Sequence, residues 1–109
     1  FDKPVQPSFY PVTSLMISLR SDDGQRHYML LQLVLEANSD AGEVIKRAEP
    51  LIRNILIQTY GNKTISDLSK ANQIVPLQNE GRTEINKVLK KNNFDIHIIN
   101  LVFTRMVFQ

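Results

Sequence analysis

Residues 12–37 read VTSLMISLRSDDGQRHYMLLQLVLEA, and this stretch decides the fold. Over residues 12–20 the side chains alternate, which predicts a strand with one buried face. The residues expected on that face are Thr13, Leu15, Ile17 and Leu19. The Asp23-Gly24 pair that follows favours a tight hairpin turn, because both residue types tolerate a positive φ.

A second strand is predicted over residues 27–37, which completes an antiparallel hairpin. Its expected core face consists of Met29, Leu31, Leu33 and Leu35. Upstream, residues 1–11 contain Pro4, Pro7 and Pro11, so this segment is predicted to be an extended linker. The domain is therefore expected to occupy residues 12–109.

Helical periodicity follows the hairpin. Apolar residues recur at helical spacing over residues 41–59, and Ser39 or Asp40 is the expected cap. Because Pro50 lacks an N–H and crowds the preceding turn, the helix is predicted to kink or restart there. Thr64 is expected to cap a short helical turn, which has Asp67 near its start.

The C-terminal third is predicted to hold a connector, a helix and a long strand. Residues 71–78, which include Pro76, form the connector, and residues 80–91 form the helix. The strand covers residues 95–109 and has two apolar faces, one with Ile96, Ile98, Val102, Met106 and Phe108, the other with Ile99, Leu101, Phe103 and Val107. Its length predicts a tail that projects past the core. The fold class is therefore α+β, with a small antiparallel or mixed sheet packed on helices.

The bulk composition is typical of one ordinary domain. The chain has 109 residues, no cysteine and a formal net charge of +2. So small a charge does not require a polyanionic partner, and the lack of cysteine excludes disulfides and thiol chemistry. No apolar run is long enough to cross a bilayer. Because the chain starts at Phe1, it is expected to be a fragment or a processed product.

No motif predicts catalysis, a metal site or a cofactor. His27 and His97 lack a third ligand at metal spacing. The carboxylates lie in turns or on polar helix faces, where nothing would raise their pKa toward acid–base work. The glycines form no phosphate-binding loop. A non-enzymatic domain without a small-molecule substrate is expected.

Nucleic-acid binding is an alternative from another class. Lys87, Lys90 and Lys91 cluster on one predicted helix, and Phe103, Arg105 and Phe108 on the last strand could contact bases. However, these groups lie on different elements, and the glycines of an RNA-recognition strand are missing. Apolar strand surface exceeds what two long helices can cover, which favours an interaction module that uses sheet edges or faces.

Three stretches carry a family resemblance. They are AEPLIRNILI at residues 48–57, continued by Lys63-Thr64 and Asp67-Leu68; the helix with Gly81-Arg82, Ile85-Asn86 and Leu89; and LVFTRMVFQ at residues 101–109. In this order and spacing, and after a β-hairpin, they resemble the periplasmic domain of FliL, the flagellar basal-body-associated protein.

The resemblance implies a fold like that of stomatin and prohibitin domains, whose members assemble into rings at membranes. It implies a position on the periplasmic side of the bacterial inner membrane, at the flagellar basal body, with a membrane helix ahead of the linker. The implied role is non-enzymatic: a homo-oligomeric ring that associates with stator units and supports their activation and torque under load. Neither nucleic acid nor a cofactor is implied.

The resemblance also marks individual residues. The positions it marks as structural are Pro50, Ile52, Asp67, Leu68 and Gln109. The interface candidates are Arg53, Phe103, Thr104 and Arg105, of which the two arginines are expected to be exposed and Phe103 is also a core candidate. A general membrane-scaffold domain that acts on a protease or channel is the alternative with the same fold.

Overall fold

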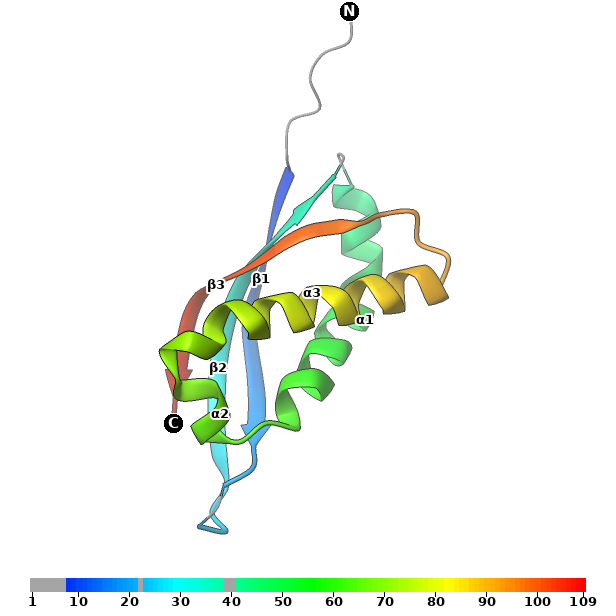
Figure 1. The fold of residues 1–109 in the computed structure, drawn as a ribbon. Helices are drawn as coiled ribbons and strands as arrows, with labels where there is room; N and C mark the ends of the chain where they lie inside the picture. The colour runs from blue at the N-terminus through cyan, green and yellow to red at the C-terminus, as the bar shows by residue number, and fades with distance from the viewer. Residues whose placement is uncertain (1–7, 22, 39–40) are drawn as a thin grey trace, which may run out of the picture.

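Three strands and three helices make up the computed structural model, which describes residues 8–21, 23–38 and 41–109. Their order is β1 (Ser8–Leu19), β2 (His27–Ala37), α1 (Gly42–Gly61), α2 (Ile65–Ser69), the 3₁₀ turn η1 (Ala71–Gln73), α3 (Ile74–Lys91) and β3 (Ile98–Phe108). The strands form one antiparallel sheet in the order β1-β2-β3. α1 packs on β1, α3 on β3, and the two helices on each other (Figure 1). The α+β prediction is confirmed.

The central strand β2 matches the predicted bounds because its alternation is unbroken. Met29, Leu31, Leu33 and Leu35 are buried, and the residues between them are only partly covered. Gly24 has φ 75° in the connecting turn, where a residue without Cβ adopts the left-handed region at little cost. Asp22 lies outside the described residues.

β1 departs from the prediction at both its start and its middle. It begins at Ser8, so the predicted start of this strand at residue 12 is wrong. Val12 pairs with Leu33 and Leu15 pairs with Leu31, which leaves two residues of β1 opposite one residue of β2. Such a bulge reverses the alternation, so Val12 is buried and Thr13 is exposed, contrary to the expected core face.

The sequence predicted a kink or a restart at Pro50. α1 runs without interruption from Gly42 to Gly61, so the restart does not occur. Pro50 is exposed, and the helix bends along its length (Figure 1). The buried stripe is Ile45, Ala48, Ile52, Leu56 and Tyr60. The predicted caps Ser39 and Asp40 lie outside the described residues.

α3 begins at Ile74, within the segment predicted as a connector. Pro76 is tolerated because it lies in the first turn, where backbone N–H groups have no partner inside the helix. Gly81 lies in the helix interior and is buried against α1. Leu77, Ile85 and Leu89 complete the buried stripe.

β3 has one core face, and the two faces predicted for it are wrong. Its register with β2 shifts twice, between Gln32 and Leu33 and between Glu36 and Ala37 of β2. Each shift changes which side the next residues face, so the core side carries Ile98, Leu101, Phe103 and Met106. The strand pairs with β2 up to its end, and Gln109 exchanges backbone hydrogen bonds of 2.8 and 3.1 Å with Tyr28. The predicted projecting tail does not form.

Tyr60 lies where α1, α3 and β3 meet. It is fully buried, and its Oη donates a hydrogen bond of 2.8 Å to the Leu77 carbonyl. Its ring packs edge-on against Phe103, with 5.7 Å between ring centroids. Burial raises the pKa of Tyr60 well above its usual value, and the Glu80 carboxylate adds to this shift. The phenol is therefore a neutral donor inside the core.

The short helix α2 is held by a capping box. Thr64 Oγ1 accepts from the Asp67 N–H at 3.1 Å, and Asp67 Oδ2 accepts from the Thr64 N–H at 3.2 Å. The Thr64 backbone N–H, followed by its hydroxyl, holds the pKa of Asp67 below its usual 3.8. Asp67 is exposed, so its role is to start this turn rather than to fill the core.

This cap predicts a loss of stability in acid. A carboxyl whose pKa is lower in the folded state stabilises the fold above its unfolded pKa of 3.8, and that contribution is lost as pH falls through the lower, folded value. Asp67→Asn removes the contribution. In urea unfolding, we expect the wild-type advantage over Asp67→Asn to be larger at pH 6 than at pH 2.5. An equal difference at both pH values would contradict the role of the charge.

Candidate interaction surfaces

The face of the sheet turned away from the helices is largely apolar and uncovered by any described element. We call it the outer face. Its apolar side chains are Phe9, Pro11, Met16, Leu30, Val34, Val102 and Val107, which pair across the strands as Pro11–Val34–Val102 and Met16–Leu30–Val107. The polar pair Gln32–Arg105 lies between these two rows. Met16 is 48% exposed and Val102 50% exposed. In each row, apolar side chains of neighbouring strands lie side by side on the face exposed to water.

Three features close the free edge of β1 over residues 11–14. Tyr28 exchanges backbone hydrogen bonds with β3, so the even-numbered residues of β2 bond to β3 and the odd-numbered residues bond to β1. Pro11 is paired with the even-numbered Val34, and its backbone nitrogen therefore points to the free edge. Proline has no N–H to offer an incoming strand there. The bulge at Thr13 and Ser14 interrupts the edge further, and Ser14 has φ 61°. Both features discourage pairing with another strand.

Arg53 is the third feature. Its Nη1 donates to the Thr13 carbonyl at 2.8 Å and its Nη2 donates to the Ser14 carbonyl at 3.1 Å. Glu49, one turn earlier on α1, lies 3.8 Å away and orients the guanidinium. About a third of the Arg53 side chain stays exposed. The residue is thus fastened to the edge of β1, where it holds the bulge.

Replacing Arg53 with alanine is expected to lower the free energy of unfolding by about 1 kcal/mol, because two charge-assisted hydrogen bonds at a partly exposed site are lost. Arg53→Lys is the matched control: it keeps the charge but lacks the planar fork, so it should recover less than half of the loss. Urea unfolding measures both. Full stability of Arg53→Ala would show that the bulge holds without the arginine.

The first half of the β3 edge is closed by side-chain amides from α3. Asn86 Oδ1 accepts from the Ile98 N–H at 2.8 Å, and its Nδ2 donates to the Ile98 carbonyl at 3.0 Å. Gln78 Oε1 accepts from the Phe103 N–H at 2.8 Å. These amides satisfy the strand as a neighbouring backbone would. The sequence analysis assigned no role to Asn86 or Gln78. The signal that could have indicated one is an amide side chain at the border between the apolar and polar faces of an amphipathic helix.

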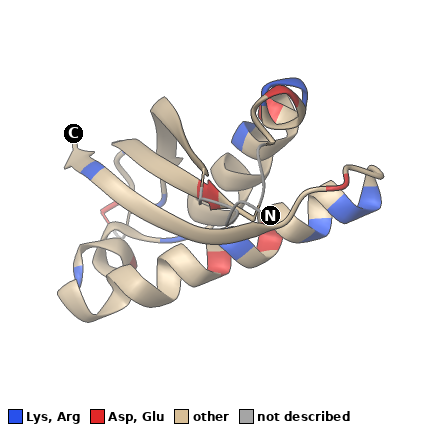
Figure 2. Ribbon diagram, turned by 90° about the horizontal axis from the view of Figure 1, so that it is seen from above, with Lys and Arg blue, Asp and Glu red and all other residues tan. Residues whose placement is uncertain are grey.

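The four interface candidates do not form one surface. Arg53 lies at the β1 edge, whereas Phe103, Thr104 and Arg105 lie on β3, beyond the central strand. Phe103 is half-buried against Tyr60, and Thr104 and Arg105 are exposed. Arg105 is the charged residue of β3, visible as the blue band near the C-terminus in Figure 2.

Four of the five predicted structural positions contribute to the fold, two from the core and two through backbone hydrogen bonds. Ile52 and Leu68 are buried, Asp67 caps α2, and Gln109 extends the β2–β3 pairing. Pro50 is the exception, because it lies on the exposed side of α1. The described residues contain no group of three or more His, Asp or Glu side chains placed to hold a metal ion.

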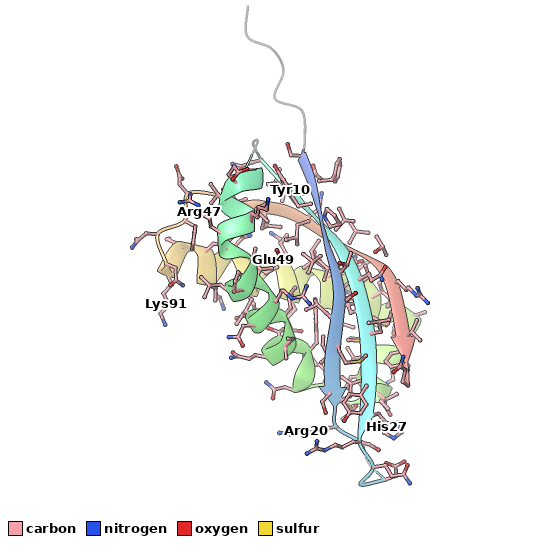
Figure 3. The ribbon with its side chains drawn as sticks, turned by 180° about the vertical axis from the view of Figure 1, so that it is seen from behind. Tyr10, Arg20, His27, Arg47, Glu49 and Lys91 are labelled. Carbon is pink, nitrogen blue, oxygen red and sulfur yellow. The ribbon has the colours of Figure 1, made fainter. Side chains whose placement is uncertain are left out.

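Basic residues and strand aromatics lie apart. Asn86 of α3 contacts the start of β3 and Gln78 contacts its middle, so the lysines that end α3 lie away from Phe108. Figure 3 likewise shows Lys91 and Arg47 on the left of the view, apart from Arg20 and His27 beside the hairpin turn. Over residues 8–21, 23–38 and 41–109, the lysines of α3 and the aromatic residues of β3 therefore do not form one continuous track.

Comparisons of this chain with known proteins identify a family. A family model described as flagellar basal body-associated protein FliL matches residues 9–109. A flagellar protein LafL of Vibrio parahaemolyticus serotype O3:K6 (strain RIMD 2210633) is 27% identical over 106 residues, which cover 94% of this chain and 62% of that relative. The chain therefore spans less than two thirds of this relative's length. None of the helices formed by the described residues has both the length and the apolar character needed to cross a membrane. The match over residues 9–109 shows that the chain belongs to the FliL family of flagellar basal body-associated proteins.

Proposed function

We propose that this domain is a non-enzymatic accessory of the flagellar motor that binds stator units and further copies of itself on the periplasmic side of the inner membrane. The outer face carries the proposal. It presents two apolar rows to water, on either side of the Gln32–Arg105 pair, in a family associated with the basal body. Surface of this kind on a globular domain marks contacts with other proteins.

Self-assembly into a ring is part of the proposal. A ring requires two different surfaces of one domain to meet, one from each neighbour. The outer face and the helix layer supply two such surfaces on opposite sides of the sheet, while the closed β1 edge disfavours open-ended strand pairing. Such a ring, anchored by a membrane helix upstream of this chain, would surround a stator unit and support its activation and torque under load.

Site-specific photo-crosslinking tests this proposal in the full-length protein in motile cells. The photoreactive residue replaces Val102 on the outer face or Arg105 on β3, both of which are exposed. Lys46 on the exposed side of α1 is the control position. We expect Val102 or Arg105 to yield adducts with a stator subunit and with a second copy of this protein.

Three results would count against the proposal. One is the absence of stator adducts from both Val102 and Arg105. Another is an adduct pattern from these positions that Lys46 reproduces, since the contact would then not involve the outer face. The third is adducts with a membrane protease or channel that persist in a strain without stator genes, which would favour the membrane-scaffold role.

A further inference from the structure

The edges of the sheet are closed unevenly. β1 is closed over residues 11–14 by Pro11, its bulge and Arg53, and the first half of β3 is closed by Asn86 and Gln78. Beyond Phe103, none of the described residues covers the β3 edge in this way. Proteins normally protect exposed strand edges, because an open edge is a template for another strand. The open segment of β3 also carries an exposed arginine without an ion pair to a described acidic residue, which the open residues 15–19 of β1 lack, and it therefore points to a binding edge.

The backbone of this segment has a defined orientation. Tyr28 and Gln109 exchange both of their backbone hydrogen bonds. In an antiparallel ladder, bonded and non-bonded pairs alternate, so Val107 and Arg105 also bond to β2, through Leu30 and Gln32. The N–H and C=O groups of Met106 and Phe108 consequently point away from β2, to the free edge. Among the described residues, no hydrogen-bond partner meets them there.

We infer that residues 104–108 bind an extended segment of a partner protein as a fourth strand, and that this segment carries a carboxylate opposite Arg105. A row of free N–H and C=O groups is matched by another extended backbone, which supplies the affinity of strand addition. The inference goes beyond the proposed function, because it describes how a strand is held whichever motor component supplies it.

Arg105 supplies the charge preference. Its side chain is exposed, and no ion pair with a described acidic residue engages it. Because Arg105 bonds to β2, it would stand in a non-hydrogen-bonded pair with the added strand, where opposing side chains come closest. Opposite charges at such a pair attract, and like charges repel. An acidic residue on the incoming strand is therefore favoured.

Phe108 supplies apolar contact at the same edge. It is 37% exposed although it lies on the core side of the sheet, opposite Met29. Val107 on the outer face is only partly covered. An incoming strand with an apolar residue beside Phe108 would cover its ring. On the other face, a β-branched residue such as threonine would lie beside Val107.

A second copy of this domain fits the open edge poorly. The β1 edge of a second copy is closed over residues 11–14 by Pro11 and Arg53, and its open residues 15–19 carry no acidic side chain to meet Arg105. Antiparallel pairing of two β3 segments about Met106 would put both Arg105 side chains on one face, on neighbouring diagonal positions. This arrangement brings like charges together. The partner is therefore a different, acidic strand.

The inference can be tested with the 109-residue chain and a synthetic peptide, Thr-Val-Thr-Val-Glu-Val-Thr-Val-Thr. Backbone amide resonances of the isotope-labelled protein are followed by NMR during titration. We expect the largest shifts, and slowed amide exchange, at Met106 and Phe108. The same peptide with lysine in place of its glutamate should bind about fivefold more weakly. Arg105→Glu should reverse this preference.

A matched pair of variants tests the contribution of the outward backbone N–H at position 108 to peptide binding. Phe108→Pro removes the outward N–H without removing a bond to β2, whereas Phe108→Val keeps the N–H and loses the same ring. We expect Phe108→Pro to weaken peptide binding by at least about tenfold relative to Phe108→Val, since a ladder bond is lost and the proline ring crowds the edge. Unchanged spectra away from β3 would show that both variants fold.

Several results would overturn the inference. These are no response at residues 104–108 at millimolar peptide, a response centred on β1, equal binding by the two Phe108 variants, or no change of charge preference in Arg105→Glu. Because this test uses the purified chain, its failure would leave the stator contact of the outer face standing. Conversely, a failed crosslinking experiment in cells would leave peptide binding at this edge intact.

Discussion

Replacing Tyr60 with alanine is expected to lower the free energy of unfolding by about 4 kcal/mol. Tyr60 is fully buried and joins three elements, through its position on α1, its hydrogen bond to Leu77 of α3 and its ring contact with Phe103 of β3. Alanine would leave a cavity that Gly81, without a side chain, cannot fill. Urea unfolding followed by far-ultraviolet circular dichroism measures the loss.

Tyr60→Phe is the control for the ring. It removes the hydroxyl and its bond to the Leu77 carbonyl but keeps the packing against Phe103. The expected cost is about 1 kcal/mol, the usual net value of one neutral hydrogen bond. If both variants lost the same stability, the hydroxyl rather than the ring would hold the three elements together.

Gly81→Ala is expected to destabilise the fold, although alanine is the better helix former. A Cβ at Gly81 would collide with the Tyr60 hydroxyl and would lie 3.2 Å from Cδ1 of Leu101. Overpacking of this kind in a buried site outweighs the gain of about 1 kcal/mol in helix propensity, so a net loss of about 2 kcal/mol is expected. Thermal unfolding of the variant checks this sign.

A double variant separates the collision from other effects. Phenylalanine at position 60 lacks the hydroxyl that a Cβ at Gly81 would meet first. Gly81→Ala combined with Tyr60→Phe should therefore lose clearly less stability than the sum of the two single changes. Simple additivity would mean that the alanine is accommodated without touching Tyr60.

Local periodicity was a good guide where it was unbroken. The pattern from His27 to Ala37 alternates without a bulge, and the predicted bounds and core face of β2 were both right. The Thr64 and Asp67 cap was also readable, because a capping box lies within four consecutive residues. In both cases the determining interactions are local or strictly periodic.

Bulges defeated the same reasoning on β1 and β3. One extra residue at Thr13 and Ser14, and two register shifts along β3, change which side chains face the core. An alternating pattern of apolar and polar residues does not indicate where the extra residue of a bulge lies. Arg53 was expected to be exposed because it is charged, yet its partners are carbonyls 39 and 40 residues away. Hydrogen bonds to main-chain carbonyls so far away in the sequence cannot be predicted from the residues around Arg53.

The two proline positions illustrate a second limit. Pro76 lies in the first turn of α3, where it is compatible with a helix, but its place in the turn depends on where the helix begins. Pro50 lies inside α1 and is accommodated by a bend rather than a break. Packing of both halves of α1 on the sheet and α3 outweighs the lost hydrogen bond.

The parallel course of β1 and β3 on either side of β2 has a mechanical consequence. Ser8 pairs with Ala37 at one end of the sheet, and Phe108 pairs with Met29 at the other. A pulling force between Ser8 and Phe108 would act along the strands, perpendicular to the hydrogen bonds that join them. All bonds of both ladders would then resist sliding together, whereas a force across the sheet would open them one at a time. The sheet therefore resists a pull along its strands better than a pull across them.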